Sequence, residues 1–150
     1  MKKLLVLIVF LSAALISYAQ IQSPVSWTFS AKKIDAKTYE VHMIATVGSG
    51  WHIYSQTTPD GGPVATTIKF TKNPLLTLDG AAKELGKLEQ RYEPLFDVDV
   101  KQFSNKVEFV QIIKMKAPVK TNVAGSIEFM VCNDTECLPP SEKKFSIALK

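Results

Sequence analysis

Two cysteines are the residues of this sequence that can most readily do chemistry. Cys132 and Cys137 are the only cysteines among the 150 residues, so they allow a single intramolecular pairing. They lie in the segment V-C-N-D-T-E-C-L-P-P, in which the polar residues 133–136 favour a turn. A strand that ends at Cys132 and a return that begins at Cys137 would bring the two sulfur atoms together across the neck of a hairpin. The spacing therefore predicts a disulfide within a tight hairpin.

Such a disulfide can either exchange with thiols or act as a structural cross-link. Closing a loop of about six residues stabilises a fold by roughly 2 kcal/mol, and here the turn already closes that loop. A disulfide across a tight hairpin is also prone to strain and is then easier to reduce. Strand alternation puts Cys132 on the face opposite Phe129 and Val131, so we expect an exposed disulfide. Spacing alone leaves redox exchange and a structural role both open.

A soft-metal site is a third hypothesis, because thiols and imidazoles are its usual ligands. The chain has two histidines, His42 and His52, besides its two cysteines. His42 is expected to point away from Met43 on its strand, and no close Cys/His spacing of the zinc type occurs. We therefore predict no metal site and no cofactor.

The N-terminus has the three parts of a secretory signal peptide. Lys2 and Lys3 give a positive start, an apolar run covers residues 4–16, and small residues precede a cut between Ala19 and Gln20. The apolar run is too short for a membrane span, which needs roughly 20 residues. We expect residues 1–19 to be removed, which places the cysteines in an exported protein, where disulfides persist.

The mature chain, residues 20–150, has the length of one domain. No later segment approaches membrane-spanning length, so we expect no membrane insertion of the mature chain. Removing Lys2 and Lys3 from the formal net charge of +4 leaves +2. That charge is too small to indicate a nucleic-acid partner, and no basic cluster with interleaved aromatic residues is present.

Alternating apolar residues predict a chain of short strands separated by turn residues. Residues 81–88 fit a weak helix, a turn or an irregular strand equally well, because Gly80 and Gly86 interrupt the pattern. The predicted strands cover residues 25–31, 39–47, 51–54, 66–70, 107–116, 127–132 and 145–149. Seven or more short strands in about 130 residues predict an all-β, immunoglobulin-like antiparallel β-sandwich.

Three segments of the chain resemble the N-terminal periplasmic domain of the thiol–disulfide interchange protein DsbD, which is an immunoglobulin-like domain. The first is residues 50–54, G-W-H-I-Y. The second is residues 89–107, with Phe96 and Phe103, which resembles the loop that caps the family's active site. The third and most specific is residues 132–140, which end in the pattern C-x-P-P. Together these segments span nearly all of the mature chain.

The resemblance implies a role for each candidate site residue. It implies that Cys137 forms a mixed disulfide with a partner and that Cys132 resolves it. It also implies a phenylalanine on the cap loop that shields the pair until a partner docks. Counting back from Phe103 gives that role to Phe96, with Tyr92 as the alternative. Two further positions, Tyr54 and His52, match residues that line the family's active site.

The resemblance also implies a partner class and a compartment. It predicts a periplasmic protein-disulfide reductase of the interchange type, which takes electrons from one thioredoxin-like protein and passes them to another. The family's membrane domain and C-terminal thioredoxin-like domain are absent from these 150 residues, so we expect donor and acceptor to be separate chains. The alternative is a non-catalytic sandwich that binds a protein and keeps a structural disulfide.

Overall fold

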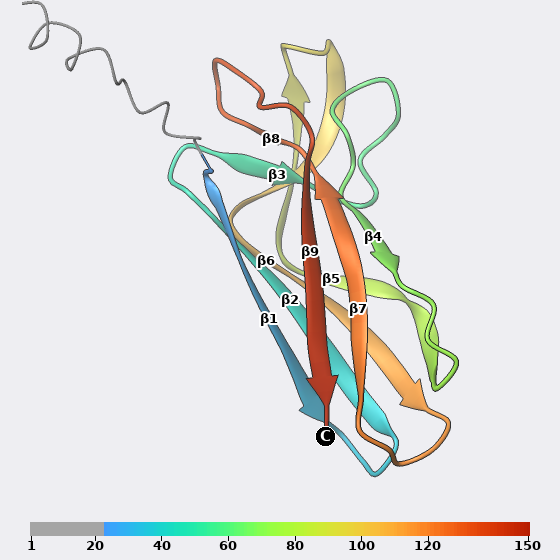
Figure 1. Ribbon diagram of the computed structural model, residues 1–150. Coiled ribbons are helices and arrows are strands. Elements are labelled where there is room, and N and C mark those ends of the chain that lie inside the picture. The colour runs from blue at the N-terminus through green and yellow to red at the C-terminus, as the bar shows by residue number, and fades with distance from the viewer. Residues whose placement is uncertain (1–22) are drawn as a thin grey trace, which may run out of the picture.

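The computed structural model describes residues 23–150, all of whose regular elements are β-strands (Figure 1). The predicted signal peptide and its cleavage point lie outside the described residues. The nine strands are β1 (Val25–Lys33), β2 (Thr38–Val47), β3 (His52–Tyr54), β4 (Thr67–Phe70), β5 (Leu76–Glu93), β6 (Val98–Met115), β7 (Thr121–Phe129), β8 (Val131–Cys132) and β9 (Ser141–Leu149).

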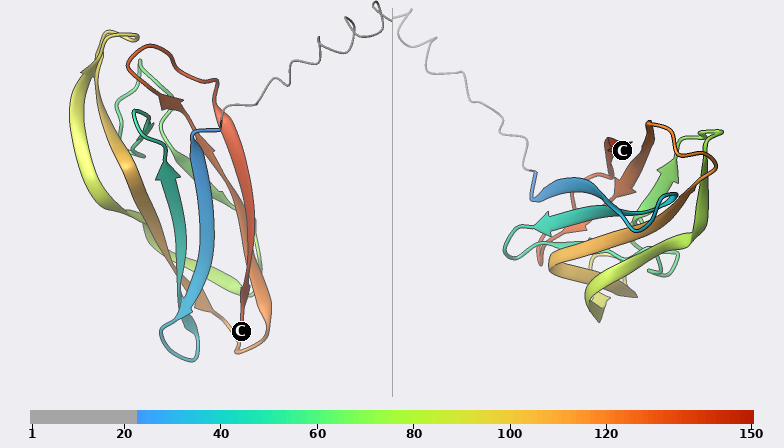
Figure 2. Two further views of the ribbon diagram at one scale, coloured as in Figure 1. Left: turned by 90° about the vertical axis from the view of Figure 1, so that its left-hand side faces the viewer. Right: turned by 90° about the horizontal axis from the view of Figure 1, so that it is seen from below.

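The strands form two antiparallel sheets that pack face to face (Figure 2). One sheet has the order β1-β2-β6-β3-β8, with β5 paired to the other side of β6, and the second has the order β4-β7-β9. This architecture confirms the predicted all-β antiparallel sandwich. Within residues 23–150, no helix is long and apolar enough to span a membrane.

The core lies between the two sheets and follows the period-two pattern of the sequence. On β2, the alternate residues Val41, Met43 and Ala45 are fully buried, and they face apolar residues from β6 and from the second sheet. Burial of this kind contributes roughly 25 cal/mol for each Å² of apolar surface removed from water. The residues that β6 and the second sheet supply to this core include Phe109, Ile113, Ile127, Phe129, Phe145 and Leu149.

In the hairpin of β5 and β6 the structure decides one alternative that the sequence leaves open and corrects the predicted cap loop. Residues 81–88 form neither a helix nor a turn but part of β5, with register shifts between Asp79 and Lys83 and between Gly86 and Leu88. The predicted cap loop over residues 89–107 is mostly strand. Glu93, the last residue of β5, pairs with Val98, the first residue of β6, and only the short turn between them is not paired. Phe103, assigned to that loop, is a buried core residue.

The elements that carry the candidate residues gather at one end of the sandwich. The three-residue strand β3 lies between β6 and β8, so that His52 is opposite Ser104 on one side and Cys132 on the other. The tip of the β5–β6 hairpin and the segment between β3 and β4 lie at the same end of the molecule, as Figure 1 shows. Short strands are sufficient here, since each of them extends a sheet that the longer strands already stabilise.

Candidate functional site

Cys132 and Cys137 form a disulfide across a tight hairpin, as the spacing predicts. Their Cα atoms are 4.0 Å apart, and four residues separate them. The backbone N–H of Leu138 donates to the carbonyl of Val131 at 3.0 Å, which closes the hairpin on the far side of the cysteines. The disulfide therefore joins two segments that backbone hydrogen bonds also hold together.

The predicted exposure of this disulfide is wrong. Cys132 does point away from the core that contains Val131, because its cross-strand partner is His52 on the outer face of β3. It is nevertheless fully buried, and Cys137 is partly buried. The reason is that this outer face is covered by a second apolar cluster. Its members, besides the two cysteines, are Tyr54, Val100, Phe96, Val98 and Met130.

The turn between β5 and β6 supplies the cover, which we call the cap (residues 94–98). Phe96 and Val98 pack against the cluster that contains the disulfide. The turn is closed by the N–H groups of Phe96 and Asp97, which donate to the carbonyl of Glu93 at 3.1 and 2.9 Å. The structure thus brings Phe96 to the cysteine pair from about 40 residues away in the sequence.

Gly62, in the segment between β3 and β4, lies directly against the cap. A Cβ atom at this position would come within 2.7 Å of Cγ2 of Val98 and 3.9 Å of Cβ of Phe96. Real Cβ atoms do not approach a side chain so closely, so Gly62 allows the two segments to touch. The cap is therefore packed against two neighbours, the disulfide cluster and this segment.

Tyr92, the alternative cap residue, lies elsewhere. Its side chain is 53% exposed, and its hydroxyl donates a hydrogen bond to Oδ1 of Asp97. This bond raises the pKa of Tyr92, because it favours the protonated hydroxyl. Tyr92 belongs to the outer surface of the hairpin rather than to the cluster around the disulfide.

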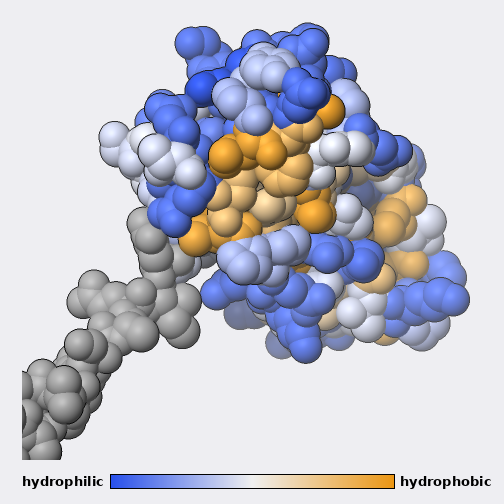
Figure 3. Space-filling view, turned by 90° about the horizontal axis from the view of Figure 1, so that it is seen from above, coloured by the Kyte–Doolittle hydropathy of each residue, from blue (hydrophilic) through white to orange (hydrophobic). Residues whose placement is uncertain are grey.

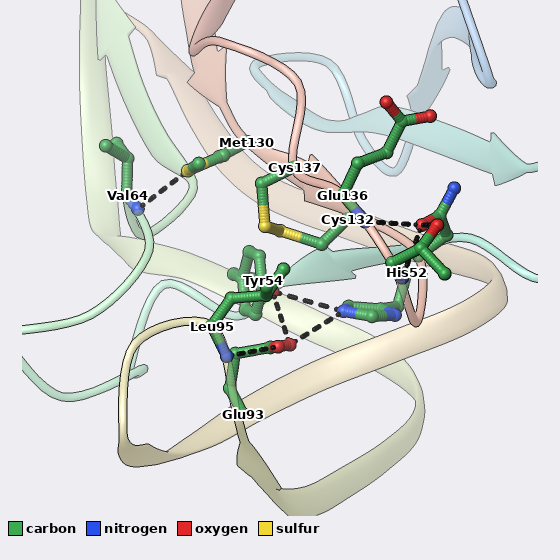
Figure 4. The surroundings of a disulfide bond; sticks show 11 residues. His52, Tyr54, Val64, Glu93, Leu95, Met130, Cys132, Glu136 and Cys137 are labelled. Atoms are coloured by element: carbon green, nitrogen blue, oxygen red, sulfur yellow. Dashed lines mark hydrogen bonds and ion pairs between the residues drawn. A yellow bond between two sulfur atoms is a disulfide. The ribbon is translucent and has the colours of Figure 1, made fainter.

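Beneath the disulfide, three buried polar side chains meet (Figure 4). The hydroxyl of Tyr54 donates to Oε2 of Glu93 at 3.0 Å, and Nε2 of His52 lies 3.3 Å from the same oxygen. Nε2 of His52 is also 3.1 Å from the Tyr54 hydroxyl. The second carboxylate oxygen accepts from the N–H of Leu95 at 3.5 Å. Glu93 thereby connects β3 to the first residues of the cap.

Burial perturbs the ionisation of this group. Desolvation lowers the pKa of His52, although the Glu93 carboxylate opposes the shift, so the imidazole is neutral at pH 7. Desolvation, together with the same carboxylate, raises the pKa of Tyr54 far above its ordinary value. The imidazole and the phenol are therefore both neutral at physiological pH, and the phenol donates to the carboxylate.

His52 should make the stability of the protein dependent on pH. Its pKa is lower in the folded chain than in the unfolded chain, where it is about 6.5, so the unfolded chain binds more protons as the pH falls below that value. The free energy of unfolding should then decrease with falling pH by at most about 1.4 kcal/mol per pH unit from this group. Urea unfolding at pH 7.5 and at pH 5 measures the effect.

The variant for this measurement is His52→Gln, which should lose less stability than the wild type between pH 7.5 and pH 5. Both proteins keep His42, which lies on the outer face of β2 with Nδ1 2.5 Å from Oε1 of Glu108, so any contribution from it cancels in the comparison. Identical pH profiles for wild type and His52→Gln would contradict the assignment.

Sequence reasoning missed Glu93. A carboxylate at the end of a strand before a proline is normally taken as a solvated turn residue, yet Glu93 is only 3% exposed. It also missed Gln102, which is fully buried opposite Tyr54 and has no hydrogen-bond partner for its amide among residues 23–150. No local pattern marks either residue, because their surroundings come from distant segments.

The structure places neither histidine in a metal-binding arrangement with the cysteines among the described residues. His42 contacts Glu40 and Glu108, whereas His52 contacts Tyr54 and Glu93. In the part of the chain that the structure describes, no three residues among histidine, cysteine, aspartate and glutamate come together in a metal-binding arrangement.

The end of the molecule that carries the disulfide presents an apolar area with a hydrophilic rim (Figure 3). Val64 and Leu95 are exposed there, and the partly buried Met130 touches the backbone N–H of Val64 through its sulfur atom at 3.4 Å. Exposed apolar groups with a polar rim are typical of sites where proteins dock. A partner on this surface would cover the cap.

Comparisons with known proteins give a consistent result. The family model described as thiol:disulfide interchange protein DsbD, N-terminal, matches residues 19–149. The structure is similar to the N-terminal periplasmic domain of ScsB from Proteus mirabilis, with a TM-score of 0.58 and 15% identity over 87% of this chain. That match covers 47% of the ScsB chain, so this chain spans less than half of its length.

Two structures from Neisseria meningitidis are also similar. The reduced DsbD N-terminal domain matches with a TM-score of 0.51 and 13% identity, over 81% of this chain and 84% of that one. The complex between the DsbD and PilB N-terminal domains matches with a TM-score of 0.51 and 11% identity, over 85% of this chain and 87% of that one. No curated protein sequence matches this chain. At these identities the structures support the fold.

Proposed function

This chain belongs to the family of the N-terminal domain of the thiol:disulfide interchange protein DsbD, and from that premise we propose that it relays electrons between thioredoxin-like proteins of the periplasm through Cys132 and Cys137. The observation that carries the proposal is a disulfide between one fully buried and one partly buried cysteine, placed beneath a cap at an apolar end of the molecule. The proposal includes removal of residues 1–19 and a mature domain of residues 20–150.

The unequal burial of the two cysteines supports their separate roles. A thiolate of a reduced donor attacks Sγ of Cys137, and the bond between Cys137 and Cys132 breaks. Cys132 leaves as a thiolate and takes up a proton, while Cys137 remains in a mixed disulfide with the donor. A second thiol of the donor then attacks the mixed disulfide and releases Cys137. Two electrons and two protons have passed to the cysteine pair, and the donor has become a disulfide.

Delivery to an acceptor is the reverse sequence. The thiolate of Cys137 attacks the acceptor's disulfide, and Cys132 resolves the resulting mixed disulfide by attacking Cys137. No cofactor takes part, because thiol–disulfide exchange moves the electrons with the bonds. A DsbD domain of Neisseria is seen in complex with the PilB N-terminal domain, which supports a docked partner protein as the exchange partner here.

The cap is proposed to select between reagents. Phe96 covers the disulfide until a partner's surface displaces it, whereas a small thiol has too little surface to do so. His52 and Tyr54 contribute by holding Glu93 at the base of the cap. A binding module with a structural disulfide is the second candidate, and the complete burial of Cys132 favours it.

The reduction potential of the disulfide decides between the two functions. Equilibration of the mature protein in dithiothreitol buffers, followed by thiol trapping, should give a value in the range of thioredoxin-like proteins, roughly −270 to −120 mV. A structural disulfide would lie below roughly −300 mV. A value in that lower range would refute the relay and leave the binding module.

Cysteine variants test the roles of the two sulfurs separately. Cys132→Ala should accumulate a mixed disulfide with a thioredoxin-like partner that keeps one active-site cysteine, activated as its thionitrobenzoate disulfide. Cys137 attacks the partner's sulfur and releases thionitrobenzoate, and neither protein then has a second thiol to resolve the new bond. Cys137→Ala is the matched control and should accumulate little, since Cys132 is fully buried. Non-reducing electrophoresis of the purified pair of proteins measures both, and equal trapping by the two variants would contradict the assignment.

A further inference from the structure

The side chain of Asn133 organises the turn that separates the two cysteines. Its carbonyl oxygen, Oδ1, accepts hydrogen bonds from the N–H of Thr135 at 2.8 Å, from the hydroxyl of Thr135 at 2.9 Å and from the N–H of Glu136 at 2.8 Å. The backbone N–H of Asn133 donates to the backbone carbonyl of Glu136 at 2.9 Å. All four contacts lie between the cysteines, and none of them involves a sulfur atom.

The two cysteines differ in what holds their backbones. Cys132 is held by the sheet, because β8 pairs with β3 and places it opposite His52. Cys137 lies outside the named strands, and its bridge to Cys132 is isolated. Its position relative to Cys132 depends on the turn at residues 133–136 and on the bond between Leu138 and Val131. The turn therefore determines how near the second sulfur remains once the disulfide is open.

Within that turn, Asn133 is the residue whose side chain bonds across the loop that the disulfide closes. Asp134 is directed outward and pairs with Arg91 of β5 at 3.2 Å. Glu136 is exposed, and the hydroxyl of Thr135 is itself a donor to Asn133. An asparagine that accepts from two backbone N–H groups in this way favours the turn without any cross-link.

We infer that Asn133 is a positioning residue that sets the reduction potential of the Cys132–Cys137 pair by keeping the turn closed in the reduced protein. The inference deepens the proposed function and rests on it for its biological meaning. When both thiols are held near each other, less conformational freedom is lost as the disulfide forms, so their effective concentration is high. A high effective concentration stabilises the disulfide and lowers its reduction potential.

The closed turn and the disulfide stabilise each other. If the turn stabilises the disulfide, the disulfide must stabilise the turn by the same free energy. Loss of the Asn133 side chain should therefore disfavour the oxidised form more than the reduced form. The reduction potential should become less negative, and resolution of a mixed disulfide at Cys137 by Cys132 should become slower.

The experiment compares the wild type with four variants by equilibration against dithiothreitol at pH 7. Asn133→Ala should lower the effective concentration of the two thiols about tenfold, which corresponds to a potential about 30 mV less negative. Asn133→Asp keeps an acceptor oxygen and should restore the wild-type potential. Thr135→Val removes one of the three bonds to Oδ1 and should shift the potential in the same direction by less.

Asn122→Ala is the matched control, because Asn122 is an asparagine in the second sheet whose side chain bonds Ser146 instead. It should leave the potential unchanged. Equal potentials for wild type, Asn133→Ala and Asn133→Asp would overturn the inference, as would a shift of the same size in Asn122→Ala. The far-ultraviolet circular dichroism of each oxidised variant shows whether it is folded, and Thr135→Val provides the test if Asn133→Ala is not.

The test of Asn133 can fail or succeed independently of the test of the proposed relay function. A wild-type potential below roughly −300 mV with a shifted Asn133→Ala would refute the relay and support the role of Asn133. A wild-type potential in the thioredoxin range without a shift in Asn133→Ala would support the relay and refute that role. The lifetime of the mixed disulfide formed at Cys137 gives a second readout, and it should be longer in Asn133→Ala.

Discussion

Replacement of Phe96 by alanine should raise the rate at which dithiothreitol reduces the disulfide by about tenfold or more. Phe96 packs on the cluster that contains Cys132 and Cys137, so a small thiol reaches the sulfur atoms only when the cap has opened. Minor conformations of this kind are commonly populated at about 0.1–10%, and removal of the ring makes the opening unnecessary. Loss of the disulfide under excess dithiothreitol, followed by quenched thiol labelling, measures the rate.

The control for Phe96 is Leu88→Ala, which truncates an exposed apolar residue of β5 in the same hairpin. Leu88 is 48% exposed and lies outside the disulfide cluster, so this variant should react at the wild-type rate. Reduction by a thioredoxin-like protein should change less than reduction by dithiothreitol in Phe96→Ala, because a docked protein displaces the cap anyway. A wild-type rate in Phe96→Ala, or equal acceleration in Leu88→Ala, would show that Phe96 does not shield the pair.

Replacement of Glu93 by alanine should lower the free energy of unfolding by about 2–4 kcal/mol. The carboxylate accepts from the buried hydroxyl of Tyr54 and contacts Nε2 of the buried His52. Without it, two buried polar groups lose their acceptor, and each such loss costs about 1–3 kcal/mol. Urea unfolding at pH 7.5, followed by tryptophan fluorescence, measures the loss.

The matched variant Glu93→Gln separates the hydrogen bonds of Glu93 from its charge. The amide oxygen can still accept from Tyr54, so this variant should lose about 1 kcal/mol, clearly less than Glu93→Ala. Since Glu93 also begins the turn that carries Phe96, Glu93→Ala should additionally accelerate reduction by dithiothreitol. Similar losses in the two variants would indicate that the hydrogen bonds to His52 and Tyr54 contribute little.

The sandwich itself could be predicted because its signals are local. Alternation along residues 39–47 and 127–132 predicts strands with one apolar face, and the structure buries those faces. Residues 127–132 are not one strand, however, because they are divided between β7 of one sheet and β8 of the other. The turn residues between Cys132 and Cys137 predict a hairpin, and the structure shows one. Residues 81–88 could not be decided in this way, because two register shifts break the alternation that marks a strand.

The cover of the disulfide could not be predicted from the same pattern. Alternation correctly places Cys132 on the face away from Val131, but it does not state what lies above that face. The cover comes from Phe96 and Val98, which reach the cysteines through the long hairpin of β5 and β6. Exposure depends on these contacts, so a local argument gave the correct face and the wrong accessibility.

The sequence by itself thus determined the sandwich, the pairing of the two cysteines and the strands outside residues 76–106, since each follows from residue types within about ten positions of one another. Only the tertiary structure decided that Cys132 is buried, that Phe96 packs on the cluster that contains the pair and that Glu93 meets His52 and Tyr54. Glu93 is separated from those two residues by 41 and 39 positions. The physical reason is that burial and desolvation are produced by segments that meet only when the sheets pack, and these effects govern access to the disulfide and the charge state of its neighbours.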